Sequence, residues 1–136
     1  MTANLVLGVK IMAYNELYTG YFAKTNKYIK LGYTPVSVAG RTPEFFKGEK
    51  WIDFAPRKEL FNRWKKKEIS NAEYCLQYME YLHTIPKEDI EELRELTKEA
   101  KFVMCCYEKS GDFCHRHSLA CFLHSYYSFN VSEVEC

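Results

Sequence analysis

The sequence lacks a strong charge of either sign and any long apolar run. Its 19 basic and 18 acidic residues leave a formal net charge of +1, so charge alone predicts no strong attraction to nucleic acid or to an anionic membrane. No apolar stretch approaches the roughly 20 residues that a membrane-spanning helix needs. The first residues also lack the basic and apolar regions of a signal peptide. These absences predict a soluble, cytoplasmic protein with no membrane partner.

Three motifs that mark large enzyme families are also missing. The chain contains no glycine-rich phosphate loop, no G-x-S-x-G nucleophile turn and no H-E-x-x-H zinc motif. It has no internal repeat, no low-complexity tract and no linker long enough to divide it. We therefore expect the 136 residues, of which 47% are hydrophobic, to fold as a single domain, residues 1–136.

Six cysteines are present, yet their placement argues against a disulfide framework. Cys105 and Cys106 are adjacent within a strand-like run, where successive side chains point to opposite faces. No signal peptide is expected, so reduced thiols in a reducing compartment are predicted.

The stretch from Lys101 to Leu123 is the most informative part of the chain. Its apolar run 102–106 has the length of a strand and no helical period, as in a strand buried on both faces. After a turn at 110–112 a helix is predicted, with Asp112 as its N-cap residue. Ligands bind beyond the carboxyl ends of strands in open parallel sheets, and helix N-termini offer N–H groups to anions. The predicted site therefore lies at this junction.

Other short segments have the composition of strands. They are residues 17–22, residues 33–39, a last piece within 130–136, and residues 5–12, which form a strand or an ordered extension. Within the first of them, Gly20 suits a close approach of backbone or a bulge.

The remaining segments are predicted as loops and helices. Residues 24–32 have the polarity of a solvated loop, and 44–55 that of an irregular aromatic loop that covers either the site or a sheet edge. Helices are predicted over 56–66, after the capping box that starts at Ser70, and from Pro86 in a first-turn position.

Helical spacing places Arg116 on the same face as the apolar Leu119 and Leu123. A buried guanidinium needs a partner, because an unpaired charge there is costly. Two partners stay open, and both can hold together. One is Glu108, in an ion pair that ties the helix to the preceding loop, and the other is an anionic ligand.

Two cysteines and a histidine surround this arginine in the sequence. Cys114 falls in the first turn of the predicted helix, where the helix dipole lowers a thiol pKa as a nucleophile requires. A half-buried structural thiol is the alternative for Cys114 and equally for Cys106, at the strand end. His115 can act as a general acid or base, or can bond a backbone group as a helix-end histidine.

Arg41 follows the predicted strand 33–39 just as Tyr107 and Glu108 follow the strand 102–106. If the two strands are parallel, both sets of residues reach the same edge of the sheet. Arg41 is therefore a candidate contributor to the site.

A zinc site is conceivable on residue type, because Cys106, Cys114, His115 and His117 are all zinc-type ligands. Their spacing matches no familiar zinc pair: there is no C-x-x-C, and two of the ligands would be adjacent. His117 is also predicted to face outward. A zinc-stabilised domain stays a further alternative, and no metal ligand is assigned.

One segment resembles the signature of domain of unknown function family 488, most of all its short stand-alone members from bacteria and phages. It reads Cys106-Tyr107-Glu108-Lys109-x-Gly111-Asp112-Phe113-Cys114-His115-Arg116-His117. Residues 18–24, 35–39 and 43–48 are similar as well, so the likeness extends over 13–125 and leaves 1–12 outside.

The resemblance implies an α/β fold, with a single three-layer-like domain and a small, mainly parallel sheet flanked by helices. It also implies a site that contains Tyr107, Glu108, Cys114, His115 and Arg116, with Arg41 as a contributor.

The resemblance brings no settled reaction, so two functions stay open, and neither fixes a cofactor or an oligomeric state. The first is an enzyme-like pocket for a nucleotide or another phosphorylated small molecule. Its residues would be Glu108, His115, Cys114 and Tyr107 for catalysis, and Arg116, Arg41 and Cys106 for ligand binding. The second is a non-catalytic module that binds protein or nucleic acid through tyrosines and lysines within 21–30 and 45–51.

Overall fold

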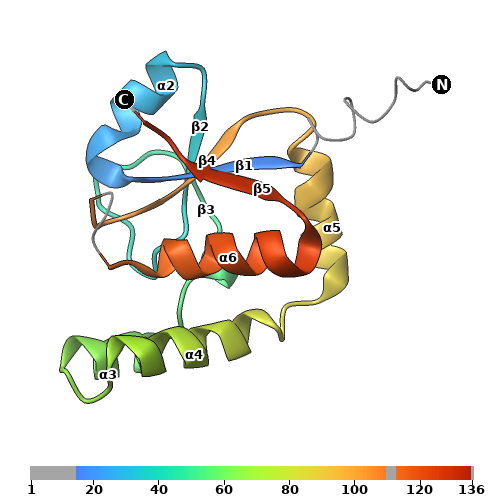
Figure 1. The fold of residues 1–136 in the computed structure, drawn as a ribbon. Helices are drawn as coiled ribbons and strands as arrows, with labels where there is room; N and C mark the ends of the chain where they lie inside the picture. Colours follow the sequence, from blue (N-terminus) through green and yellow to red (C-terminus); the bar gives the residue numbers. More distant parts are fainter. Residues whose placement is uncertain (1–14, 110–112, 136) are drawn as a thin grey trace.

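Five strands form one sheet in the order β3-β2-β4-β1-β5 (Figure 1). The computed structural model describes residues 15–109 and 113–135, so the strand or extension predicted at 5–12 lies outside the described residues. All pairs of neighbouring strands in this part of the chain are parallel. The strands are β1 (Glu16–Tyr21), β2 (Thr34–Ser37), β3 (Glu49–Lys50), β4 (Phe102–Cys106) and β5 (Asn130–Glu133). The predicted α/β class is confirmed.

Helices connect the strands and lie on both sides of the sheet. Helix α6 runs along one face of the sheet, and α4 packs against α6 on the side away from the sheet. Helix α2 lies on the opposite face (Figure 1). Parallel strands need such crossover connections. The helices are α2 (Thr25–Lys30), α3 (Lys58–Lys65), α4 (Asn71–Leu82), α5 (Lys87–Leu96) and α6 (His115–Tyr127), with 3-10 turns at Phe22–Lys24 and Ile52–Phe54.

Strand β4 is the centre of the molecule, and every one of its residues is buried, as the sequence predicts. Phe102 and Met104 belong to the larger core, which they share with residues of α4 and α6. Val103 belongs to a second core on the other face, together with Tyr28 of α2. The alternation of side chains along one strand therefore holds the layers on its two faces together.

The loop predicted over 24–32 is wrong, because Thr25–Lys30 forms helix α2. Its three lysines suggested a solvated connection, but Tyr28 is fully buried. This one large side chain anchors the segment to the sheet, and Lys27 and Lys30 then occupy the exposed side of a short helix.

Helix starts were predicted well where a side chain caps the helix. Ser70 Oγ accepts a hydrogen bond from the backbone N–H of Glu73 at 3.1 Å, at the start of α4. Pro86 is the N-cap of α5 and not part of its first turn. The aromatic loop 44–55 is largely irregular, and it buries Phe46 and Phe54, one in each core.

Gly20 leaves room for the side chain of Tyr28, which packs directly against the backbone of β1. A Cβ atom at residue 20 would lie 2.5 Å from the Tyr28 hydroxyl oxygen, and that hydroxyl accepts a hydrogen bond from the Tyr21 N–H at 3.1 Å. Because Tyr28 is buried and held by this bond, we expect Gly20→Ala to lower the free energy of unfolding by about 1–3 kcal/mol.

Urea denaturation measures this effect, and Gly40→Ala is the matched control. A Cβ atom at residue 40 would meet its nearest neighbour, the Pro56 carbonyl oxygen, only at 3.9 Å. Equal stability of the two variants would contradict the close packing of Gly20 against Tyr28.

Candidate functional site

The candidate site lies between the end of β4, at Cys106, and the start of α6, at His115. Cys114 is the N-cap of α6, with extended dihedral angles of φ −157° and ψ 144°. The helix thus begins later than predicted, and Cys114 precedes it instead of lying in its first turn. The predicted N-cap, Asp112, lies outside the described residues.

Cys106, Cys114 and His115 form a buried cluster. The two sulfur atoms are 2.6 Å apart, beyond the disulfide bond length of about 2.05 Å, and both cysteines are free. Nδ1 of His115 is 3.6 Å from the Cys106 sulfur. Both sulfurs are more deeply buried than the half-buried thiols considered from the sequence.

The tautomer of His115 follows from its second nitrogen. Nε2 is 2.7 Å from the carbonyl oxygen of Val38, and a carbonyl can only accept a hydrogen bond, so Nε2 carries the proton. In the neutral ring Nδ1 therefore keeps its lone pair, which is available to the thiols. As expected for a helix-end histidine, His115 bonds a backbone group. That group is the carbonyl of Val38, which directly follows β2, and not a group of the helix.

The two thiols influence each other's ionisation. The hydrogen bond between the two sulfurs lowers the pKa of the Cys114 thiol, and His115 and the backbone N–H of Arg116 act in the same direction. The same bond, together with burial, raises the pKa of Cys106. Cys114 is therefore the sulfur that ionises first.

Glu108 extends the cluster towards the solvent. Its Oε1 atom accepts a hydrogen bond from the Cys106 thiol at 3.7 Å, and its side chain is half-buried. Desolvation raises the pKa of this carboxyl group, and the neighbouring Cys114 raises it further. Among the described residues of the cluster, Glu108 is thus the group that both the buried thiols and an incoming molecule can reach.

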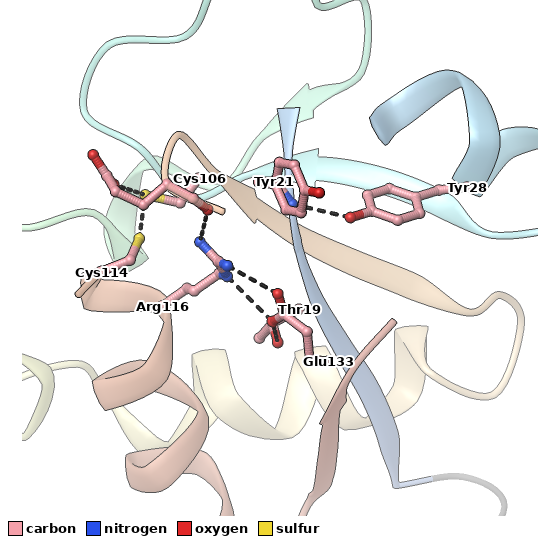
Figure 2. A network of polar contacts seen from close by, with 8 residues as sticks. Thr19, Tyr21, Tyr28, Cys106, Cys114, Arg116 and Glu133 are labelled. Atoms are coloured by element: carbon pink, nitrogen blue, oxygen red, sulfur yellow. Dashed lines mark hydrogen bonds and ion pairs between the residues drawn. The ribbon is translucent and has the colours of Figure 1, made fainter. Parts of the chain in front are cut away.

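Arg116 is fully buried, as the helical spacing predicts. Its partner is Glu133 on β5, which accepts from Nε at 3.2 Å and from Nη2 at 2.8 Å (Figure 2). Burial disfavours the charged form, but the hydrogen bonds to Glu133 outweigh it and raise the pKa of Arg116. Arginine suits this place because its planar group binds a carboxylate with two parallel bonds.

The ion pair predicted between Arg116 and Glu108 is therefore wrong in its partner. Nη1 of Arg116 donates instead to the backbone carbonyl of Glu108 at 2.6 Å, while the Glu108 carboxylate turns to the thiols. The arginine still ties the helix to the loop, but through the main chain.

Glu133 is the residue of this site that sequence reasoning missed. It lies within the predicted last strand and belongs to no motif. A weak signal was present, because Glu133 and Val131 share one face of the strand and Val131 packs against the core. Only the pairing of β5 with β1, which sets Glu133 opposite Thr19, brings the carboxylate towards Arg116.

Arg41 and Tyr107 lie at the same sheet edge, as expected from two parallel strands. Strands β2 and β4 are neighbours in parallel register, and the Tyr107 hydroxyl donates to the backbone carbonyl of Arg41 at 2.6 Å. Desolvation raises the pKa of the Tyr107 hydroxyl, although the positive charge of Arg41 acts to lower it. Tyr107 is 47% exposed, Arg41 is exposed, and His117 faces outward as predicted.

In the described part of the chain, one group of three side chains can offer ligand atoms to a metal ion. It consists of Cys106, Cys114 and His115, whose ligand atoms all lie within 4.8 Å of one another.

Among the helices that the structure describes, none is both long and apolar enough to cross a membrane.

The sequence model of a family termed DUF488-N3a, described as the active DUF488-N3 subclade, matches residues 29–127. No curated protein and no solved structure matches the chain.

Proposed function

The chain belongs to the DUF488 family, and from this premise we propose that the junction of β4 and α6 is a catalytic site for a small anionic molecule, a nucleotide or another phosphorylated compound. The observation that carries the proposal is the half-buried Glu108, which contacts buried thiols on one side and solvent on the other. The description of the matching subclade as active supports an enzyme. Ligand sites of parallel α/β sheets also lie at this edge.

Glu108 is the proposed proton-transfer group. General acid–base catalysis needs a carboxyl group that is held in place and that the substrate can reach. The backbone of Glu108 is held by Arg116, whose Nη1 donates to its carbonyl oxygen. We therefore assign Arg116 as a positioning residue that acts through Glu108. The Cys106 thiol, which donates to the carboxylate, and the neighbouring Cys114 are the groups on its buried side.

Arg41 is the proposed contact for the anion. Arg116 is also a ligand-binding candidate from the sequence, but its charge is already balanced by the carboxylate of Glu133 at 2.8 Å. Arg41 has an exposed side chain at the same edge of the sheet. The hydrogen bond from Tyr107 fixes the backbone of this arginine, and an exposed guanidinium is well suited to bind phosphate.

The proposal is tested first by binding. The probes are ATP, AMP, GMP and inorganic pyrophosphate, screened by the thermal shift of the full chain and then by calorimetry. For the probe that binds, Arg41→Ala is expected to weaken the affinity about tenfold to a hundredfold, because a charge-assisted hydrogen bond contributes about 1.5–3 kcal/mol.

Arg63→Ala is the matched control, since Arg63 is also exposed but lies on α3. It should leave the affinity unchanged. The proposal of an anionic substrate held by Arg41 is wrong if none of the four probes binds. It is also wrong if Arg41→Ala binds the probe as tightly as the unaltered chain.

A further inference from the structure

The three buried side chains at the junction converge on one point. We propose that Cys106, Cys114 and His115 bind one Zn²⁺ ion, with a fourth coordination position open on the side of Glu108. Two thiolates and an imidazole are ligands that favour zinc over magnesium or calcium, which prefer oxygen.

The spacing of the ligand atoms fits a tetrahedral ion. With Zn–S bonds of about 2.3 Å and Zn–N bonds of about 2.0–2.1 Å, a sulfur and a nitrogen ligand lie about 3.5 Å apart. The Cys106 sulfur and Nδ1 of His115 are 3.6 Å apart. The two sulfurs are 2.6 Å apart and have to separate to about 3.8 Å in a tetrahedral site. Entry of the ion therefore requires the two sulfurs to separate by about 1 Å.

The surroundings of the ligands are those of a metal site. A histidine ligand commonly donates its other ring N–H to a carbonyl group, which orients the ring. His115 does so through Nε2, with the Val38 carbonyl at 2.7 Å, and the Cys114 sulfur accepts from the backbone N–H of Arg116. Two thiolates would also balance the charge of Zn²⁺, so the buried cluster would be neutral as a whole.

The adjacency of Cys114 and His115 argued against zinc in the sequence, and the local backbone removes this objection. Cys114 is extended, whereas His115 is the first helical residue. The change of conformation between them turns two neighbouring side chains towards the same point, which neither a continuous helix nor a strand would do. His117, in the first turn of the helix, is exposed and takes no part.

Three protein ligands leave the fourth position of a zinc ion for water, as in catalytic zinc sites. Glu108 Oε1 is 3.7 Å from the Cys106 sulfur, so its carboxylate would lie beside such a water. The role of a metal-bound water beside Glu108 rests on the proposed function. The binding of the ion itself is independent of that function.

The test uses the untagged full chain, produced in zinc-supplemented medium and purified with a reducing agent. Elemental analysis is expected to give about one zinc per chain. Replacement of the ion by Co²⁺ should give a thiolate-to-cobalt charge-transfer band in the near ultraviolet and strong visible bands of tetrahedral coordination. Cys114→Ser and His115→Ala should lose the metal, and the matched control Cys121→Ser, with an exposed thiol on the same helix, should keep it.

The decisive measurement is on the unaltered chain, so it does not depend on whether the variants fold. The proposal is overturned if this chain carries no zinc and takes up neither Zn²⁺ nor Co²⁺ under reducing conditions. It is also overturned if intact mass shows the loss of two hydrogens, a disulfide between Cys106 and Cys114. A metal-free chain that binds a nucleotide through Arg41 would remove only the zinc site, and a zinc-loaded chain that binds no probe would remove only the proposed substrate.

Discussion

Glu133→Gln is expected to lower the free energy of unfolding by about 3–5 kcal/mol, the cost of leaving a buried charge without its partner. Arg116 is fully buried, and Glu133 is the carboxylate that accepts from it twice, at 2.8 and 3.2 Å. An amide keeps the shape of the side chain but carries no charge to balance the guanidinium. Denaturation in urea, followed by circular dichroism, measures the loss.

Glu135→Gln is the matched control, because Glu135 lies two residues further on and is exposed. It should change stability by less than about 0.5 kcal/mol. The double variant Arg116→Met with Glu133→Leu should recover most of the loss, since an apolar pair of similar volume often replaces a buried ion pair at little cost. A Glu133→Gln protein as stable as the Glu135→Gln protein would contradict the importance of this ion pair.

Glu108→Gln is expected to lower turnover of the nucleotide probe that binds by about 10²- to 10⁴-fold, the usual contribution of a general acid or base. Its affinity for the probe should stay nearly the same, because the contact with the anion is assigned to Arg41. The fold should also survive, since Arg116 holds the backbone carbonyl of residue 108 and not its side chain. Product formation at saturating probe, compared with calorimetric binding, separates the two effects.

Glu44→Gln is the control for this experiment, because Glu44 is an exposed carboxylate on the loop that follows Arg41. Its turnover should equal that of the unaltered chain. If Glu108→Gln turns over the probe at the full rate, Glu108 is not the proton-transfer group. Binding without turnover in the unaltered chain would favour the alternative of a non-catalytic binding module.

The fold could be predicted from the sequence wherever local pattern is sufficient. The buried run 102–106 became β4, and the segment that starts at Ser70 became α4. The prediction failed at Thr25–Lys30, because the lysines of the segment 24–32 outweighed Tyr28. A single buried aromatic side chain decides the state of a short segment, and composition does not reveal which aromatic is the buried one.

For the residues of the candidate site, the sequence predicted some positions in the fold but not their contacts. The positions of Arg116, on the inward face of its helix, and of Arg41, at the shared sheet edge, agree with the sequence-based expectations. The roles of the site residues in binding and catalysis stay predictions, which the variants of Arg41 and Glu108 address.

The sequence by itself determined that β4 is buried on both faces and that Arg116 points inward, because the periodicity of apolar residues is a local property of the chain. Only the tertiary structure decided that Glu133 balances Arg116 and that two thiols and an imidazole meet. These contacts depend on the order of the strands and on one change of backbone conformation at Cys114. Such contacts join segments that no local pattern connects.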